Sequence, residues 1–446
     1  MMELVAVCEW SPHPKAAPIT RKGDDGALVI EPNGTRTCVG GWLLHYAGFE
    51  PGQIYSFHCE VDHDGLESVR DALRCVVYWT DMTTDLRGAS PNRVWDSLLP
   101  ETSGPGRLRF SRVIAAPDEA DRATVACVLR WATMGRSQWT PPRIAVAPAA
   151  AIAPPKRHVR VCAVTGQRKK AKGSVATVQD NVARFAGLCE AACEGETPDL
   201  IALPEIALQI GLGGDACETA VAAPGAETDV FAAIAKRHRT RVVVGMIERD
   251  GDAVFNSAVL ISPHGEIDGK YRKVHLATGG FPGEYMSSVR PGDGFPVYDT
   301  EIGRIGCNIC KDSSYPESSR MVGLGGADFL VLPIMGDHRA APWDNSSPRF
   351  DEDRWRAIMR VRAMDNQLCL VVARNAGEGS CVIDRSGAVL AYNPGDRDFI
   401  AATVDMAAGY RVWNGGCFRE DVWLQRRPER YGPYVDPTNY GPYADV

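Results

Sequence analysis

The first third of the chain alternates apolar and polar residues with the period of two that is typical of half-buried β-strands. In residues 54–61, Tyr55, Phe57, Cys59 and Val61 share one parity, and the positions between them are polar. Further short β-prone runs, separated by turns rich in Gly, Pro and Asp, cover residues 72–81, 107–117 and 123–133. Many short strands with turns between them predict an antiparallel β-sandwich of the jelly-roll kind over residues 1–148.

From residue 159 onward the pattern changes, and short apolar runs alternate with helical segments. In the first helical segment, Val178, Val182, Phe185 and Leu188 recur near the helical period. Expected helices cover residues 175–195, 228–240 and 351–366, and expected strands cover residues 158–166, 198–205, 241–248, 257–267, 328–335 and 368–375. This alternation predicts a layered α/β domain over residues 159–408.

Two segments fall outside these patterns. Residues 149–158 are rich in Ala and Pro, and because proline restricts its own φ and the residue before it, we expect a semi-rigid linker there. Residues 409–446 form a C-terminal tail whose end is rich in Tyr, Pro and Gly and has no helix or strand pattern. The 446 residues are thus expected to form two domains, a linker and a tail.

The composition narrows the classes of function. The chain is 45% hydrophobic and 24% charged, and its net charge of -7 includes no block of Lys and Arg that would suit a nucleic acid. No apolar stretch approaches the ~20 residues that span a bilayer, and the first residues lack the pattern of a signal peptide. The 14 cysteines are scattered, as is typical of buried thiols in a reducing compartment. We therefore expect a cytoplasmic protein with no nucleic-acid or membrane partner.

Three apolar runs end in residues that can carry chemistry: Glu205 after "LIALP", Lys273 in "YRKVHL" and Cys310 in "GRIGCNICKD". A rigid sheet places such strand-end residues, so catalytic groups are often found there. Taken singly, each of them is more often a surface charge or a packed residue than a catalytic group.

The C-x-x-C spacing of Cys307 and Cys310 has three interpretations: a redox pair, half of a zinc site, or one nucleophile with a packed neighbour. A redox pair is expected near a helix start in a small thioredoxin-like domain, and that context is missing. A zinc site needs two further ligands. Cys189 and Cys193 are the nearest candidates, and positions facing a core explain them more simply.

The order Glu, Lys, Cys, with each residue closing an apolar strand of one α/β domain, resembles the nitrilase superfamily of carbon–nitrogen hydrolases. Further matching segments are "SPHGEIDGKYRKVHL", "SSYPESSR", "GADFLVLP", "RAMDNQLCLVVARN" and "GSCVIDRSGAVLA". The resemblance implies an αββα sandwich for the hydrolase domain and a homodimer or higher homo-oligomer. The domain before it resembles galactose-binding or carbohydrate-binding sandwiches, which implies a carbohydrate as one candidate partner.

The resemblance also implies a catalytic triad of Glu205, Lys273 and Cys310. Glu205 is then the general base, Lys273 supplies positive charge for the thiolate and the oxyanion, and Cys310 forms a thioester. Residues three apart on a strand face opposite sides, so we expect Cys307 to be the packed neighbour. Glu284 matches a second glutamate of the family, which helps to position the substrate and the lysine.

The sequence departs from the family pattern directly after the nucleophile. Relatives often carry Cys-Tyr-Asp, and nitrilases carry Cys-Trp-Glu, whereas this chain has Cys310, Lys311 and Asp312. The missing Trp-Glu pair favours amide or carbamoyl substrates over nitriles. The Lys311 side chain either favours the thiolate, meets an acidic group of the substrate, or points to solvent. The resemblance further places the long segment 333–355 at the substrate pocket, unless it is an exposed insertion. Its candidate substrate-positioning residues are Asp337, His338 and Trp343.

These observations together predict an amidohydrolase that cleaves a small linear amide or N-carbamoyl C–N bond through a cysteine thioester. No metal and no organic cofactor is implied. The alternatives are a nitrilase, an N-acyltransferase that passes the thioester to an amine, or a carbohydrate-binding protein with a hydrolase-like scaffold.

Overall fold

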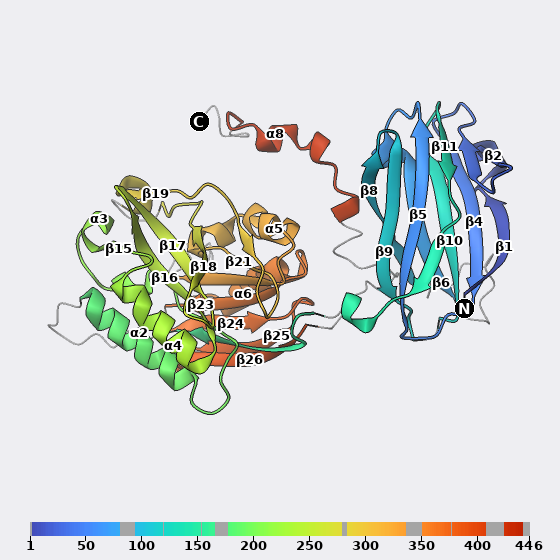
Figure 1. Ribbon diagram of the computed structural model, residues 1–446. Helices are drawn as coiled ribbons and strands as arrows, with labels where there is room; N and C mark the ends of the chain where they lie inside the picture. The colour runs from blue at the N-terminus through green and yellow to red at the C-terminus, as the bar shows by residue number, and fades with distance from the viewer. Residues whose placement is uncertain are drawn as a thin grey trace. The chain divides into compact units, whose positions relative to one another are not determined.

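The computed structural model describes residues 2–80, 94–118, 120–152, 154–165, 177–278, 283–335, 350–375, 377–406 and 423–439. The chain divides into two compact units, one made of residues 1–153 and 409–446 and the other of residues 154–408 (Figure 1). Each unit is described by itself. None of the helices in the described ranges is long and apolar enough to cross a membrane.

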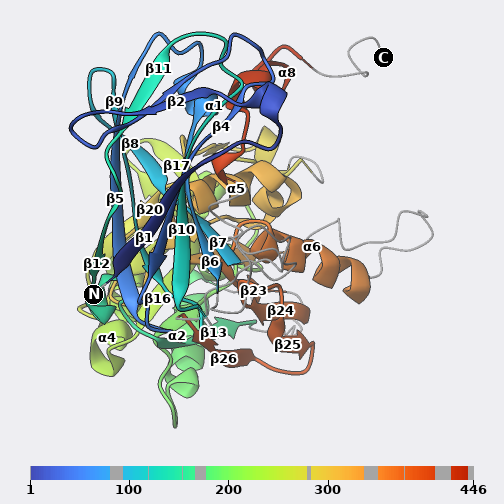
Figure 2. The same cartoon turned by 90° about the vertical axis from the view of Figure 1, so that its right-hand side faces the viewer.

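The first unit consists of two antiparallel β-sheets, as the alternating pattern predicts. Its strands are β1 Glu3–Trp10, β2 Ile19–Lys22, β3 Leu28–Glu31, β4 Val39–Ala47, β5 Ile54–Asp64, β6 Leu73–Thr80, β7 Val94–Ser97, β8 Leu99–Gly104, β9 Arg107–Ala115, β10 Arg122–Arg130, β11 Arg136–Trp139 and β12 Arg143–Val146. One sheet has the order β1-β4-β10-β6-β7, and the other has β2-β3-β11-β5-β9-β8 with β12 paired to β5 (Figure 2). A short helix, α1 Val69–Ala72, precedes β6.

The core of the first unit lies between these two sheets. On β5 the residues of the predicted inward parity, Tyr55, Phe57, Cys59 and Val61, are at most 1% exposed. Three of the six tryptophans in residues 1–153 are core residues: Trp42, Trp79 and Trp139. Trp10 and Trp131 are exposed. Burial against the facing sheet therefore accounts for much of the aromatic content of this unit.

The described part of the tail contacts α1 of the first unit. Arg427 forms an ion pair with Asp71, and Arg70 donates a hydrogen bond to the carbonyl oxygen of Arg426. Two short helical turns follow, η7 Pro428–Arg430 and α8 Gly432–Val435. The sequence pattern does not predict these turns, because one-turn helices are too short to show a periodicity.

The second unit has two β-sheets with helices on their outer faces. Its strands are β13 His158–Val164, β14 Leu200–Ala202, β15 Val221–Ala222, β16 Arg241–Asp250, β17 Ala253–Ile261, β18 Ile267–Arg272, β19 Val289–Arg290, β20 Val297–Tyr298, β21 Ile305–Cys307, β22 Phe329–Ile334, β23 Cys369–Arg374, β24 Glu378–Ile383, β25 Val389–Pro394 and β26 Phe399–Asp405. Its helices are α2 Val178–Ala192, α3 Ala216–Thr219, α4 Ala226–His238, α5 Pro316–Leu324 and α6 Glu352–Met364. The path of one sheet is β18-β17-β16-β14-β13-β26, and the path of the other is β20-β21-β22-β23-β24-β25.

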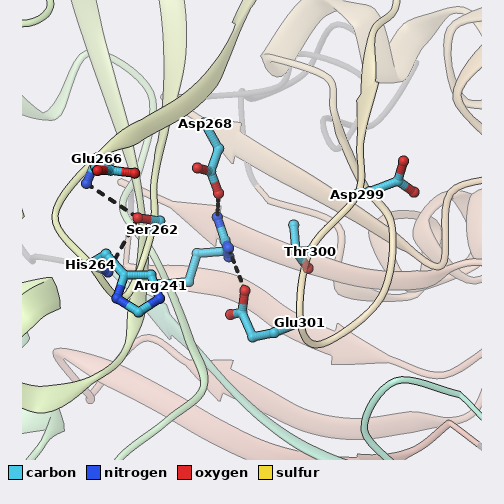
Figure 3. A pocket seen from close by; sticks show the side chains of 8 residues that line it. All are labelled: Arg241, Ser262, His264, Glu266, Asp268, Asp299, Thr300 and Glu301. Carbon is cyan, nitrogen blue, oxygen red and sulfur yellow. Dashed lines mark hydrogen bonds and ion pairs between the residues drawn. The ribbon is translucent and has the colours of Figure 1, made fainter.

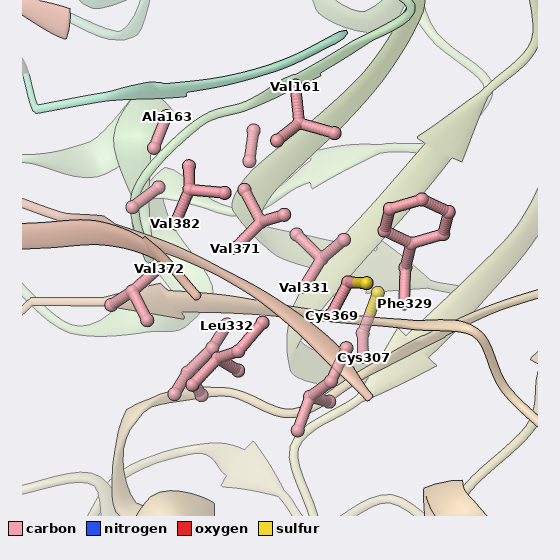
Figure 4. Packing of buried hydrophobic residues seen from close by; sticks show 14 of the residues in the cluster. Val161, Ala163, Cys307, Phe329, Val331, Leu332, Cys369, Val371, Val372 and Val382 are labelled. Carbon is pink, nitrogen blue, oxygen red and sulfur yellow. The ribbon is translucent and has the colours of Figure 1, made fainter. Parts of the chain in front are cut away.

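The layers follow from alternation along the central strands. Val161 and Ala163 of β13 point into the core between the two sheets, where they pack with Val331 and Val371 of the second sheet (Figure 4). The intervening Cys162 and Val164 pack instead with α2 and α4 on the outer face. Helix α6 packs on β23 and β24 of the other sheet. This arrangement is the αββα sandwich that the family resemblance implies.

The helix starts show which local signals can be read from sequence. Thr177 caps α2, because its hydroxyl accepts from the Asp180 N–H while the Asp180 carboxylate accepts from the Thr177 N–H. Helix α4 begins at Ala226, earlier than the predicted start at Thr228. The Thr228 hydroxyl accepts from the Gly225 N–H and so stabilises a first turn that contains it.

Candidate active site

Glu205 lies three residues beyond β14 and is 3% exposed. The neighbouring strand β16 approaches it closely at Gly245. A Cβ atom at this position would lie 2.2 Å from the carbonyl oxygen of Pro204 and 3.0 Å from the Cα of Glu205. Both contacts are with backbone, which cannot turn aside, so the position of Glu205 requires glycine at residue 245.

Lys273 follows β18 directly, and its side chain is 1% exposed. Its ammonium donates to Glu205 Oε1 at 2.7 Å and to Glu284 Oε2 at 2.6 Å. Glu284 is the first residue of the turn η4 Glu284–Met286, and its Oε2 also accepts from the Ala277 N–H at 2.8 Å. Three charged residues predicted from the sequence thus meet in one buried cluster.

Asn256 on β17 joins the same cluster and was not predicted from the sequence. Its Nδ2 donates to Glu205 Oε1 at 2.8 Å and to Glu284 Oε1 at 2.5 Å. The N–H of Met335, at the end of β22, donates to Glu205 Oε2 at 2.7 Å. Both oxygens of Glu205 are therefore held in place. The available signal for Asn256 was a lone amide within an otherwise apolar strand.

Charge decides the protonation state of Lys273. Burial alone would lower the pKa of this ammonium, but the negative charges of Glu205, Cys310 and Glu284 outweigh burial and raise the pKa above its usual range. The ammonium is therefore a fixed positive charge at neutral pH. A negative charge on Cys310 would raise the pKa of Lys273, so this side chain lies within electrostatic reach of the ammonium.

Cys310 begins the turn η5 Cys310–Ser314, between β21 and α5. The backbone φ of Cys310 is +42°, and the residue is 7% exposed. A left-handed backbone costs a residue with a side chain about 1–2 kcal/mol, so the surrounding contacts must hold the turn in place. Such strain is common where a side chain must be presented for function.

Cys307 is the last residue of β21 and lies in the core, next to Cys369 (Figure 4). Burial raises the pKa of its thiol to about 12. Cys307 is the packed neighbour that the sequence predicts, but the predicted reason is wrong. Strand β21 ends at Cys307, so Cys310 is not part of the strand and alternation does not apply to it. The strained turn, and not the pleat of the strand, separates the two thiols.

Asp312 anchors this turn to the segment that carries Lys273. Its Oδ2 accepts from the Tyr271 hydroxyl at 2.6 Å and from the Ile309 N–H at 2.8 Å. Its Oδ1 accepts from the His275 N–H at 3.0 Å and lies 2.8 Å from His275 Nδ1. Burial and the charge of Asp312 raise the pKa of Tyr271. The carboxylate is fully buried, so it fixes the turn that begins at Cys310 relative to Lys273.

The structure describes only some of the other sequence-predicted residues. Lys311 is half-buried, and no ion pair links it to any residue in the described ranges. Asp337, His338 and Trp343 lie outside the described residues. Cys189 and Cys193 are buried in the core beneath α2, where burial raises the pKa of each thiol.

A separate cavity of about 320 Å³ lies at the opposite ends of the strands, where Arg241 begins β16 (Figure 3). Its guanidinium donates to Asp268 at 2.5 Å and to Glu301 at 2.6 Å. Arg241 is paired in register with Leu200, the first residue of β14, whereas Glu205 follows the last. This cavity therefore belongs to the far edge of the sheet and not to the cluster around Lys273.

The charged cluster has the parts that amide cleavage requires. It combines a thiol on a strained turn, a buried carboxylate within reach of a fixed ammonium, and backbone N–H groups at the start of the turn. A side chain that accepts protons and a fixed positive charge are what a thiol needs in order to act as a nucleophile at neutral pH.

Comparisons with known proteins agree with this geometry. The family model described as carbon-nitrogen hydrolase matches residues 160–412. Citrullinase from Francisella tularensis is 32% identical over 224 residues, which are 46% of this chain and 74% of that protein. The chloroplastic omega-amidase of Arabidopsis thaliana is 30% identical over 243 residues, covering 48% of this chain and 60% of that protein. An omega-amidase from Homo sapiens is 27% identical over 242 residues, which are 51% of this chain and 83% of that protein.

Among solved structures, a carbon-nitrogen hydrolase from Helicobacter pylori G27 has the same fold as the second unit. The match has a TM-score of 0.50 at 21% identity, and it covers 63% of this chain and 99% of that one. The family match spans more than half of the chain and coincides with the αββα unit that holds the Glu205–Lys273–Glu284 cluster. The chain therefore belongs to the carbon-nitrogen hydrolase family, the nitrilase superfamily.

Proposed function

We propose that the second unit is an amidase that hydrolyses a small linear amide or N-carbamoyl compound through a thioester on Cys310. One observation carries the proposal above all others. The Lys273 ammonium bridges the Glu205 and Glu284 carboxylates in one site, at 2.7 and 2.6 Å, in the same unit as the strained turn that begins at Cys310. A buried cation held between two carboxylates and beside a thiol has a clear catalytic use, whereas a purely structural role would leave the strain at Cys310 unexplained.

In the first half of the reaction, Glu205 takes the proton of the Cys310 thiol as the sulfur attacks the carbonyl carbon. The negative charge that develops on the carbonyl oxygen is stabilised by the Lys273 ammonium and by the backbone N–H of Lys311. Glu205 then returns the proton to the departing nitrogen. The C–N bond breaks, ammonia or an amine leaves, and the acyl group remains on the sulfur.

In the second half, Glu205 takes a proton from water as the water oxygen attacks the thioester carbon. The C–S bond breaks, and the proton passes from Glu205 to the sulfur. The acid product leaves, and Cys310 is a thiol again. Asn256 and the Met335 N–H hold the Glu205 carboxylate in one orientation through both halves.

Charge balance explains why the site suits this sequence of steps. Two carboxylates and one ammonium give the cluster a net charge of about -1 while Cys310 is a thiol. Transfer of the thiol proton to Glu205 keeps this total unchanged, because a neutral acid replaces a carboxylate as the thiolate forms. The buried site therefore never has to hold an additional charge, which would be costly away from water.

The substrate class rests on two further points. The named relatives include a citrullinase and omega-amidases, so one carbamoyl compound and ω-amides head the set of candidates. The residue after the nucleophile is Lys311 and not the Trp that nitrilases usually carry. Both points favour amide or carbamoyl substrates over nitriles.

The experiment is an ammonia-release assay on matched panels of linear amides, N-carbamoyl compounds including citrulline, and nitriles. Turnover is expected on one of the first two panels. Cys310→Ala should abolish it, and intact-protein mass spectrometry should detect an acyl adduct only when Cys310 is present. Cys307→Ala is the matched control, since this thiol lies three residues away in the core and should leave turnover largely intact. Turnover that survives in Cys310→Ala would disprove the nucleophile.

Assays on the same purified protein distinguish three alternatives. A nitrilase would release ammonia chiefly from the nitrile panel. An N-acyltransferase would give an N-acyl product with an added amine faster than it gives free acid. A scaffold without activity would form no acyl adduct with any panel member.

Two further proposals concern assembly and the first unit. We propose a homo-oligomer, which light scattering after size-exclusion chromatography would test. Carbohydrate binding by the first unit also stays a prediction. Trp10 and Trp131 are exposed among the described tryptophans of this unit, so a glycan-array signal that is lost on Trp131→Ala would support it.

A further inference from the structure

Three cysteines of the first unit form a cluster that the hydrolytic chemistry does not use. Cys59 lies on β5 of one sheet, and Cys75 and Cys127 lie on β6 and β10 of the other, where they are direct partners in the strand register. Their sulfur atoms all lie within 4.8 Å of one another, and those of Cys59 and Cys127 are 4.0 Å apart. Each of the three residues is at most 1% exposed.

The spacing of the sulfurs matches the geometry of a three-coordinate thiolate site. A metal–sulfur bond of about 2.3 Å places the three sulfurs of a trigonal site about 4.0 Å apart. The Cys59–Cys127 separation already has this value. In the described parts of the chain, no other group of three thiol, imidazole or carboxylate side chains has metal-site spacing.

The donor set and the surroundings select the kind of ion. Thiolate sulfur is a soft ligand that favours Cu(I) or Zn(II) over oxygen-seeking ions. Structural Zn(II) almost always takes four ligands, whereas this cluster offers three side chains. Cysteine binds metals as the thiolate, so each of the three thiols gives up its proton when the ion binds.

We propose that Cys59, Cys75 and Cys127 form a Cu(I) site that joins the two sheets of the first unit. Binding exchanges no electrons. Thiol protons leave to solvent, and sulfur–copper bonds form in their place. The bound ion stabilises the folded unit, because the three thiols come from separate strands and assemble only on folding. The proposal is independent of the hydrolytic reaction in the second unit.

The test is a titration of the full-length protein with Cu(I) under anaerobic conditions, against a colorimetric Cu(I) chelator. The wild type is expected to bind one equivalent tightly, with a higher thermal unfolding midpoint in the loaded protein. Cys75→Ala and Cys127→Ala should each weaken binding by roughly 100-fold or more and remove the thermal shift. Cys38→Ala is the matched control, because Cys38 is equally buried in the same unit but lies outside the cluster.

X-ray absorption of the copper-loaded wild type tests the same site without any substitution, so its result does not depend on whether the variants fold. X-ray absorption at the copper edge should give three sulfur neighbours at about 2.2–2.3 Å. Oxygen or nitrogen neighbours of the copper would overturn the proposal. Equal copper binding by Cys127→Ala and Cys38→Ala would overturn it too, because the copper would then be bound by other groups, such as the exposed thiols of Cys8 and Cys217. Absence of binding by the wild type would overturn it as well and would leave the three thiols as apolar packing. A parallel titration with Zn(II) should show weaker binding at the cluster, and tighter Zn(II) binding there would refute the choice of ion.

Discussion

A quantitative prediction concerns Asp312, which holds the turn that begins at Cys310. Asp312→Asn keeps the shape of the side chain and removes its charge. The carboxylate accepts from the N–H groups of Ile309 and His275 through different oxygens. An amide nitrogen cannot accept a hydrogen bond. Whichever way the new amide is oriented, one of these two backbone N–H groups therefore loses its partner.

The magnitude follows from these contacts. A buried N–H without a partner costs about 1–3 kcal/mol, and each remaining bond changes from charge-assisted to neutral at a cost of about 1 kcal/mol. The free energy of unfolding should fall by about 2–5 kcal/mol. The loss is also felt at Cys310, whose left-handed backbone is held against a strain of about 1–2 kcal/mol. A shift of the sulfur by ~1 Å is enough to lower kcat about 100-fold.

Two assays check this prediction. Urea unfolding gives the free energy, and the rate of alkylation of Cys310 by iodoacetamide reports the nucleophile without requiring a known substrate. Asp351→Asn is the matched control. Asp351 caps α6 by accepting from the Arg354 N–H at 3.0 Å, and Asn is an equally good cap, so this variant should change stability by less than ~0.5 kcal/mol. If Asp312→Asn behaves like Asp351→Asn in both assays, Asp312 is not the anchor described here.

The remaining predictions concern Lys273 and Gly245. Lys273→Met should lower the free energy of unfolding by about 3–5 kcal/mol, because Glu205 and Glu284 lose their buried counter-ion. The same variant should lower kcat by about 100- to 1000-fold. Unchanged stability in urea unfolding would contradict the ion pairs of Lys273. Because folding raises the pKa of Lys273, the stability that its charge contributes is complete below the unfolded pKa of about 10.4 and is lost as the pH rises through the higher folded value. The difference in stability between wild type and Lys273→Met should thus stay constant from pH 7 to about pH 10, and a difference that declines near pH 8 would argue against a raised pKa. Gly245→Ala should lower activity at least ~100-fold by displacing Glu205, whereas Gly187→Ala, where a Cβ meets no atom within 4 Å, should be neutral or slightly stabilising by thermal unfolding.

The two folds could be predicted from local patterns in the sequence, whereas the charged cluster was predicted through the resemblance to the nitrilase superfamily. The alternation of Tyr55 and Phe57 with polar neighbours is visible without a structure, and so is a glutamate or lysine that closes an apolar run. The partners of these charges could not be predicted. Asn256 reaches Glu205 across 51 positions of the chain, and the Met335 N–H reaches it across 130. Such contacts depend on strand order, which a single sequence does not reveal.

The strained turn at Cys310 was also beyond the sequence. Positive φ is expected of glycine, and a cysteine gives no local sign that its backbone is left-handed. The four contacts of Asp312 join residues 271–275 to residues 309–312, two segments that meet only in the folded protein. Strain and its supports are properties of the tertiary structure, so a motif reveals the chemistry of a residue but not how it is presented.

The return of the tail to the first unit has a consequence for synthesis on the ribosome. Asp71 and Arg427 are 356 residues apart, and the whole hydrolase unit is translated between them. At about 5–20 residues per second, the N-terminal sheets wait roughly 20–70 s for their last segment. During that interval residues 154–408 emerge from the ribosome, and the hydrolase unit can fold before the last segment of the first unit is made. A single cut in residues 149–158 would likewise leave the two units joined through the other end of the hydrolase unit.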